Sequence, residues 1–169
     1  WQGRLHEIEA ARETVLSMGA INTPKVLMLS GVGDEALLKP LGARVLCHLP
    51  GVGKNLQDHI LLGGCIWEYK DPLPMTNSGA DSMFFTKSRP ELDTPDLYPV
   101  HIQLPYASPV IAKRYAPPAS CWAIAPGLVR PKSRGRVELR SLDPDARPVL
   151  HPDYLSHPDD VRALMRGVE

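Results

Sequence analysis

The sequence lacks the features that mark several classes of protein. Its 169 residues contain no apolar run near the roughly 20 residues that cross a bilayer, and we expect no transmembrane segment. Neither charge is in excess, because 19 basic residues balance 19 acidic ones, and this balance argues against nucleic acid as the main partner. The three cysteines include no Cys-x-x-Cys pair, which predicts three reduced, mostly buried thiols with no disulfide scaffold and no metal site.

An initiator methionine and a targeting segment are also missing. Residue 1 is Trp1, and no signal or transit peptide follows it. This beginning is typical of an internal stretch of a longer protein, although processing or a shortened gene product gives the same pattern. We therefore expect that N-terminal and C-terminal parts of the protein's own chain are missing, and we predict a cytoplasmic location.

Proline is the residue in excess. The 18 prolines are about twice the usual share of roughly 5%. This density excludes a helical bundle or a coiled coil, because each interior proline costs a helix about 3 kcal/mol. With 43% hydrophobic residues the chain can still form a core, and its length suits one domain or a piece of a larger protein.

The first 60 residues predict short strands and helices. The apolar run at 14–18 predicts a short buried strand that ends at Gly19. Thr23 and Pro24 are typical of a helix start, with threonine as the N-cap and proline at the first helical position. The further elements expected here are a helical segment over 26–29, a short helix over 35–41 capped by Asp34, a strand over 44–49 and a tight turn over 50–53.

Beyond about residue 60, short strand-like runs recur between proline-rich connections, and this spacing favours an antiparallel sheet. The runs occupy residues 61–69, 82–87, 98–104, 120–129 and 135–141. The last segment, 158–168, predicts an amphipathic helix. Asp159 and Asp160 lie in its first turn, where acidic side chains interact favourably with the helix dipole.

A glycine pattern at 31–36 matches G-x-G-x-x-A, which is typical of dinucleotide-binding βαβ units. Three observations disfavour that interpretation. The unit from Val26 to Leu49 spans 24 residues, against about 30 expected. Pro40 interrupts the helix that would face the pyrophosphate. No acidic residue lies at the end of the second strand, where a ribose hydroxyl would need one.

Three ordered blocks carry a more specific signal. They are GAINTPKVLMLSGVG at 19–33, LPGVGKNLQDH at 49–59 and SRGRVELRSLDP at 133–144, and PDYL follows at 152–155. Together they resemble the motifs of the glucose–methanol–choline (GMC) family of FAD-dependent oxidoreductases, in particular its choline-dehydrogenase-like members. The resemblance covers nearly the whole chain and is weakest between 60 and 130.

The resemblance implies a fold of the α/β plus α+β class, with part of an FAD-binding dinucleotide-type domain and an antiparallel-sheet substrate domain. Residues 1–60 would belong to the FAD-binding domain and residues 61–157 to the substrate-binding domain. Residues 158–169 would be the start of a truncated helix.

The resemblance also implies FAD as the cofactor. The residues expected beside it are Gly19, Ala20, Thr23, Asn55, Asp58 and His59. The missing side chain at Gly19 lets a phosphate or ribose approach the backbone, and Thr23 at a helix N-cap would leave N–H groups available to oxygen acceptors. For the last three residues, the alternative is a polar turn whose side chains bind nearby backbone.

The implied reaction is hydride transfer from a primary alcohol, choline-like or other, to flavin N5. Asp81 and Phe84 would lie beside the substrate cavity, although a polar turn before a strand is the simpler explanation of Asp81. The histidine that removes the hydroxyl proton is expected C-terminal to Glu169, and the Gly-rich FAD fingerprint is absent. We therefore expect no catalytic residue within the chain and no alcohol turnover by these residues alone.

Two other functions stay open from the sequence. The first is a flavin-containing lyase of the same fold, and the second is a non-catalytic β-rich binding domain that needs no flavin. Flavin absorbance separates the binding domain from the enzymes, and reduction of an electron acceptor separates the oxidoreductase from the lyase.

Overall fold

The computed structural model describes residues 3–4, 6–76, 78–80 and 82–169. The chain divides into two compact units. Unit 1 comprises Trp1–Lys54 and Val137–Leu150, and unit 2 comprises Asn55–Arg136 and His151–Glu169. Among the described residues, no helix has the length and apolar character needed to cross a membrane.

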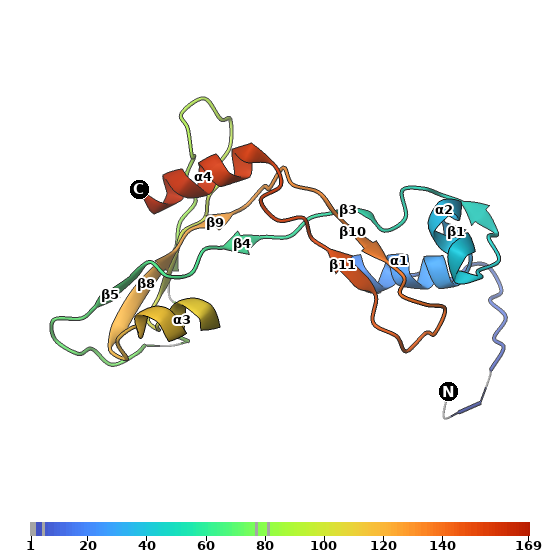
Figure 1. The fold of residues 1–169 in the computed structure, drawn as a ribbon, viewed down its shortest axis with the longest axis horizontal. Helices are drawn as coiled ribbons and strands as arrows, with labels where there is room; N and C mark the ends of the chain where they lie inside the picture. The colour runs from blue at the N-terminus through green and yellow to red at the C-terminus, as the bar shows by residue number, and fades with distance from the viewer. Residues whose placement is uncertain (1–2, 5, 77, 81) are drawn as a thin grey trace. The chain divides into compact units, whose positions relative to one another are not determined.

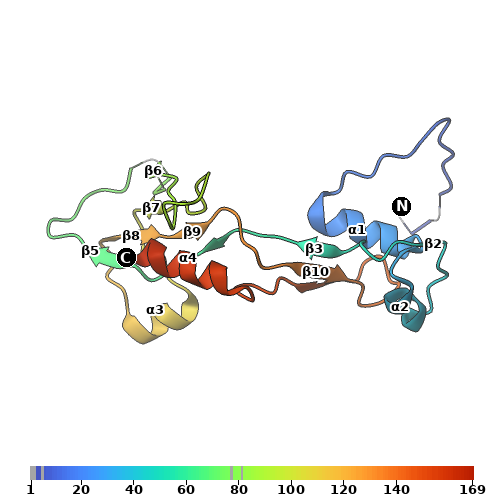
Figure 2. The same ribbon diagram turned by 90° about the horizontal axis from the view of Figure 1, so that it is seen from above.

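Unit 1 is built around two short parallel strands and two helices. The elements are α1 (Gly19–Leu29), β1 (Val32–Gly33), α2 (Glu35–Leu38), the 3₁₀ helix η1 (Lys39–Leu41) and β2 (Cys47–His48). All except η1 are labelled in Figures 1 and 2. β1 pairs with β2, and Val32 lies opposite Cys47. The buried side chains of Met28 and Leu38 pack against this pair at Gly33.

The expected strand at 14–18 is wrong. These residues form no strand, and all of them are exposed, with Val15 76% exposed. A strand needs a neighbour to satisfy its backbone groups, and this segment pairs with no other strand in the described part of the chain.

The helix start predicted at Thr23 is also wrong, because α1 begins earlier, at Gly19. Met18 occupies the N-cap position, and the Thr23 hydroxyl accepts a hydrogen bond from the Met18 N–H at 2.9 Å. Pro24 therefore lies inside the helix, where its ring removes one backbone donor. The threonine tethers the residue before the helix and does not cap the helix itself.

The second helix of unit 1 confirms the sequence-based expectation. Asp34 is the N-cap of α2, and its Oδ1 accepts a hydrogen bond from the Ala36 N–H at 3.1 Å. The helix then tightens into η1 at Pro40, as expected for a proline that cannot donate to the helical ladder. The predicted turn at 50–53 is also present. The strand predicted over 44–49 is shorter, because only Cys47–His48 pair.

Close backbone packing explains why residue 31, the first glycine of the G-x-G pattern, has no side chain. Its carbonyl accepts hydrogen bonds from the N–H groups of Leu46 (2.7 Å) and Cys47 (3.2 Å). Its φ is +79°, and a Cβ there would collide with the Arg44 carbonyl oxygen. Glycine is required at this crossing for steric reasons within unit 1.

A three-stranded sheet has the order β11-β10-β3, with β3 at Lys54–Leu56, β10 at Gly135–Glu138 and β11 at Val149–His151. β10 confirms the first half of the run predicted over 135–141. β11 was not predicted, because its three residues follow a turn and a proline without a clear alternating pattern.

Unit 2 contains the predicted antiparallel sheet. Its four strands have the order β5-β8-β7-β6, with β5 at Ile66–Glu68, β8 at Cys121–Ala125, β7 at Val100–Ile102 and β6 at Ser82–Met83. All three pairings are antiparallel. Trp67 lies opposite Trp122, and their rings stack with centroids 4.6 Å apart. The α/β plus α+β class is confirmed by these mixed helices and antiparallel sheets.

A second antiparallel pair in unit 2 joins β4 (Ile60–Leu61) to β9 (Gly127–Leu128). The predicted C-terminal helix is present as α4 (Pro158–Val168), and it lies alongside β9 in Figures 1 and 2. Ala163 and Leu164 of α4 pack against Leu97 and Leu128, and all four side chains are buried.

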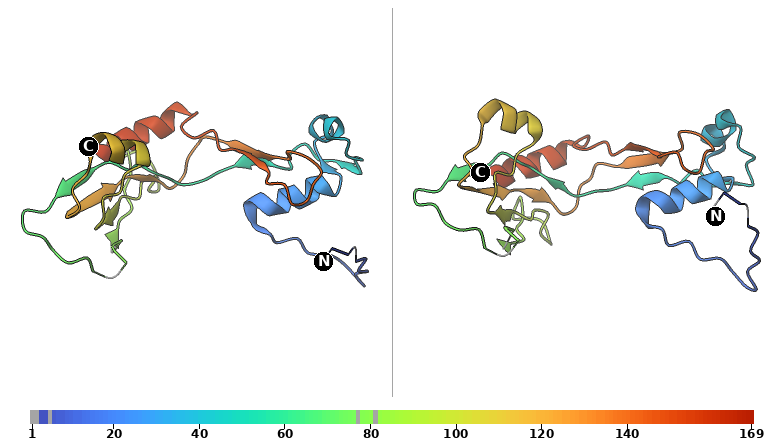
Figure 3. Two further views of the ribbon diagram at one scale, coloured as in Figure 1. Left: turned by 60° about the horizontal axis from the view of Figure 1, so that its bottom comes forward. Right: turned by 90° about the horizontal axis from the view of Figure 1, so that it is seen from below.

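The helix α3 (Pro109–Tyr115), gold in Figure 3, was not predicted. Its N-cap is Ser108, whose hydroxyl oxygen accepts a hydrogen bond from the Ile111 N–H at 3.3 Å. The serine followed by Pro109 is a helix-start signal, but none of the helix's residues is buried. A short helix without a buried face gives no hydrophobic periodicity to detect.

The cysteines are all free thiols, but the expectation that most are buried is wrong. Cys121 is buried in β8, Cys65 is partly buried, and Cys47 is exposed in β2. Cys47 is exposed because both residues of β2 face solvent.

We predict that Leu128→Ala destabilises unit 2 by about 2–5 kcal/mol, because it removes a buried side chain and leaves a cavity between β9 and α4. Leu73→Ala is the matched control, since Leu73 is 63% exposed, and surface substitutions change stability by about 0.5 kcal/mol or less. Urea denaturation measures both. Equal losses for the two variants would contradict the packing described for Leu128.

Candidate functional site

In unit 1, Gly19 and Ala20 form the first turn of α1, and both residues are exposed. No side chain caps this helix, and its first turn carries no acidic residue. Gly19 has φ +81°, and a Cβ built there meets nothing within 4 Å. The helix start is therefore open to an oxygen acceptor, because the first N–H groups of a helix have no partner within the helix.

Thr23 lies one turn later and contributes indirectly to this helix start. Its hydroxyl is engaged with the Met18 N–H, so it fixes the residue that precedes Gly19. Thr23 lies near Gly19 and Ala20, but its expected N-cap role is replaced by this tether.

Asn55, Asp58 and His59 belong to unit 2 and are exposed. Asn55 lies in β3 with φ +64°, a left-handed conformation that asparagine tolerates better than most residues. Asp58 and His59 follow in the segment between β3 and β4, outside any strand.

Asp58 is held by hydrogen bonds at both carboxylate oxygens. Its Oδ1 accepts from the His59 N–H at 2.9 Å, and its Oδ2 accepts from the Tyr154 hydroxyl at 2.5 Å. The His59 ring lies against the Tyr98 ring, with centroids 5.5 Å apart. The polar-turn interpretation is thus partly correct, since one of the two bonds is local. Tyr154 was missed as a partner, and its only sequence signal is its place in the PDYL block.

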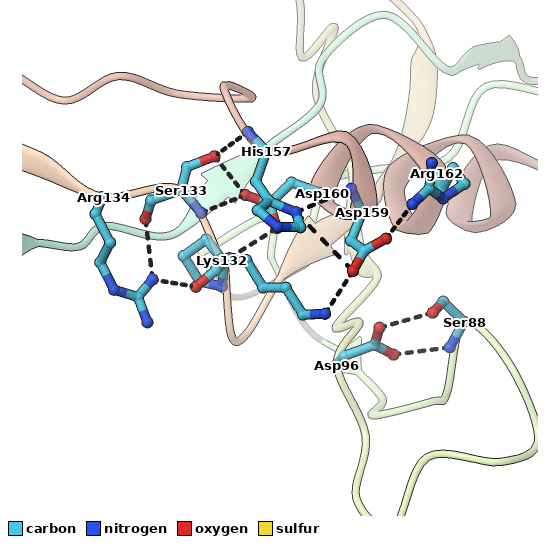
Figure 4. Close-up of polar contacts among 10 residues, drawn as sticks. Ser88, Asp96, Lys132, Ser133, Arg134, His157, Asp159, Asp160 and Arg162 are labelled. Atoms are coloured by element: carbon cyan, nitrogen blue, oxygen red, sulfur yellow. Dashed lines mark hydrogen bonds and ion pairs between the residues drawn. The ribbon is translucent and has the colours of Figure 1, made fainter.

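A cavity of about 630 Å³ in unit 2 is bordered by Asp58 and His59. The opposite walls come from three segments that the sequence did not connect with this site. Polar and charged residues that line them are Ser88, Arg89, Asp96, Arg130, Lys132, Arg134, Asp159, Asp160 and Arg162. Figure 4 shows the contacts among most of these side chains.

Asp160 is the most buried charged group at the cavity, at 2% exposure. Its Oδ1 accepts a hydrogen bond from the Lys132 N–H at 2.7 Å. Its Oδ2 accepts from the N–H and the hydroxyl of Ser133, at 2.8 and 2.5 Å (Figure 4). Burial alone would raise the pKa of Asp160, but these hydrogen bonds stabilise the carboxylate and lower the pKa overall.

The neighbouring Asp159 bridges two cations. Its carboxylate pairs with the Lys132 ammonium and with the Arg162 guanidinium (Figure 4). The hydrogen bonds from Lys132 and Arg162 lower the pKa of Asp159 to about 2. At neutral pH both carboxylates on this wall are therefore ionised.

Asp96 and Arg134, at other walls of the cavity, also have hydrogen-bond partners. Both oxygens of Asp96 accept hydrogen bonds from Ser88, one from its N–H and one from its hydroxyl, each at 2.7 Å. The Arg134 guanidinium donates to the carbonyl oxygens of Pro131 (2.6 Å) and Ser133 (3.0 Å). The walls are thus rigidly organised by charge-assisted and backbone hydrogen bonds.

Of the two residues expected beside a substrate, the structure describes only Phe84, and it does not lie at this cavity. Phe84 follows β6, is 59% exposed and is absent from the cavity lining. Asp81 lies outside the described residues. The described residues also contain no group of three or more side chains suited to hold a metal ion.

Comparison with known proteins supports the resemblance found in the sequence. Family models described as GMC oxidoreductase match residues 2–61 and 131–169. Choline oxidase from Arthrobacter globiformis is 36% identical over 169 residues, covering 98% of this chain and 31% of the oxidase. Mitochondrial choline dehydrogenase from Homo sapiens is 37% identical over 187 residues, covering 94% of this chain and 30% of the dehydrogenase. The chain thus spans about a third of the length of these curated relatives.

Solved structures give the same result for the fold. Pyridoxine 4-oxidase from Mesorbium loti has a TM-score of 0.79 and 26% identity, covering 89% of this chain and 30% of that one. A formate oxidase has a TM-score of 0.73 over 94% of this chain and 36% of that one, and at 21% identity the likeness shows the fold alone.

We predict that unfolding free energy decreases as the pH falls from about 4 towards 2, because Asp159 titrates near pH 2 when folded and near its ordinary value of 3.8 when unfolded. The unfolded chain then binds more protons, so acid favours unfolding. The lowered pKa of Asp160 acts in the same direction.

Urea denaturation at a series of pH values measures this dependence. Asp159→Asn should flatten the slope between pH 4 and about 2, because the neutral amide does not titrate. Asp71→Asn, at an exposed position in the same unit, should keep the wild-type slope. A wild-type slope in the Asp159 variant would show that its ion pairs add no stability.

Proposed function

Because the chain belongs to the GMC oxidoreductase family, we propose that it belongs to an FAD-dependent enzyme that oxidises a primary alcohol, choline-like or other. The observation that carries the proposal is the match of both ends of the chain to GMC models in their N-terminal to C-terminal order. The named activities of its relatives, choline oxidase and choline dehydrogenase, point to the alcohol. A small-molecule alcohol is accordingly the proposed partner, and the cytoplasmic location stays a prediction.

The start of α1 fits a group such as FAD. A glycine whose Cβ space is empty allows close approach, and an uncapped first turn offers N–H donors to phosphate or ribose oxygens. Gly19 and Ala20 would supply these donors, and Thr23 would fix the backbone of Met18 beside them. When bound, FAD supplies the hydride acceptor at its N5 position.

In unit 2, Asn55, Asp58 and His59 are the residues proposed to lie near the cofactor. Both carboxylate oxygens of Asp58 accept hydrogen bonds, which restrict its side chain. The His59 ring lies against the Tyr98 ring, and this contact restricts its orientation. We assign it no proton transfer, because the histidine that removes the hydroxyl proton is expected C-terminal to Glu169.

The decisive experiment is anaerobic addition of alcohols to the purified flavoprotein that contains these residues. We expect loss of oxidised-flavin absorbance with at least one alcohol from a panel that includes choline and pyridoxine, because hydride transfer reduces the flavin. A flavin that stays oxidised while a cyanohydrin is cleaved would favour the lyase. A preparation without flavin would favour the binding domain.

A matched pair of glycine variants tests the role of the helix start. Gly19 and Gly42 have φ +81° and +82°, and neither has an atom within 4 Å of an added Cβ. Gly19→Val and Gly42→Val therefore carry the same backbone cost, about 1–2 kcal/mol for a left-handed residue. We expect only Gly19→Val to lower the flavin content of the purified protein. Equal flavin content in both variants would remove Gly19 from the cofactor site.

A further inference from the structure

The contact between Tyr154 and Asp58 joins two motif blocks that are 96 residues apart in the sequence. The hydroxyl of Tyr154 donates to Asp58 Oδ2 at 2.5 Å, and both residues belong to unit 2. A short hydrogen bond to a carboxylate is stronger than one between neutral groups. It therefore holds the Asp58 side chain more firmly than a typical surface contact would.

The segment that carries Asp58 has few other polar contacts. Residues 57–59 lie between β3 and β4, outside any strand. Their further side-chain hydrogen bonds are local, from Gln57 to the Asn55 carbonyl and from the His59 N–H to Asp58. The bond from Tyr154 is thus the long-range polar tether of this segment within the described residues.

The tether reaches His59 through Asp58. One carboxylate oxygen is bound by Tyr154, and the other accepts from the His59 backbone N–H at 2.9 Å. The peptide of His59 is therefore fixed relative to Tyr154, and its ring is directed against Tyr98 at a tilt of 54°. Both Asp58 and His59 border the cavity of unit 2.

We propose that Tyr154 is a positioning residue that holds Asp58 and, through it, the orientation of His59 at the cavity. The contact stands on the geometry of unit 2 alone, and its relevance to a flavin rests on the proposed function. The hydrogen bond to Asp58, together with burial, raises the pKa of Tyr154, so the phenol keeps the proton that it donates.

The test uses the purified protein that contains these residues, and its readouts do not depend on flavin turnover, so its outcome is separate from that of the proposed function. Tyr154→Phe keeps the ring and removes only the donor. Tyr115→Phe is the control, because Tyr115 is 66% exposed and contacts Arg114 in α3, away from Asp58. The readouts are the Hε1 resonance of His59, which senses the Tyr98 ring, and hydrogen exchange at the His59 amide.

We expect Tyr154→Phe to shift the His59 Hε1 resonance and to speed exchange of the His59 amide by about fivefold, the factor that corresponds to one hydrogen bond. Tyr115→Phe should change neither. An unmoved resonance and an unchanged exchange rate in Tyr154→Phe would overturn the proposal, because a tyrosine that only fills space would give that result.

A second variant keeps the proposal testable if Tyr154→Phe does not fold. Asp58→Asn removes the negative charge and leaves Tyr154 in place. We expect the titration of Tyr154 to move to lower pH in this variant, because the hydrogen bond to Asp58 is the main cause of its raised pKa. Tyr98, whose pKa the Asp58 charge also raises, should move in the same direction, and the His59 resonance should shift. If neither the Tyr154 titration nor the His59 resonance changes, Tyr154 does not act through Asp58.

Discussion

The buried carboxylate of Asp160 is the interaction on which the cavity of unit 2 depends. A charge at 2% exposure is costly unless hydrogen bonds replace its water, and here three donors from Lys132 and Ser133 do so. Two of those donors are backbone groups, so the bonds fix the path of the main chain as well as the side chains. The Ser133 hydroxyl also accepts from the His157 N–H at 3.1 Å, which joins the residue before α4 to the same cluster.

The hydrogen bonds of Asp160 also position the side chains of two segments, the one at Lys132–Ser133 and the first turns of α4. With the Lys132 backbone held by Asp160, its ammonium lies where Asp159 can pair with it, and Asp159 pairs in turn with Arg162 on α4. The Lys132 and Arg162 cations on this wall are therefore balanced by Asp159. Leu164 packs against Leu128. The helix α4 is therefore held both by this apolar contact and by the hydrogen bonds and ion pairs of Asp159 and Asp160.

The features that the sequence predicted correctly depend on neighbours along the chain. The cap at Asp34, the end of its helix at Pro40 and the amphipathic pattern of α4 each involve residues a few positions apart. Several of the features it missed depend on distant partners. The Tyr154–Asp58 bond spans 96 residues, and no local pattern marks it. The candidate site divides in the same way, because motif blocks identified Gly19 and Asp58, whereas the cavity walls opposite Asp58 emerged only from the fold.

The extended segment before α1 has a consequence for handling the protein. Residues 14–18 combine β-branched and aliphatic side chains that are all exposed, and their backbone has no strand beside it in the described chain. An unpaired segment of this kind is a template for edge-to-edge association between molecules. We therefore expect self-association to increase with protein concentration. A charged substitution at Val15, which is 76% exposed, should reduce this self-association.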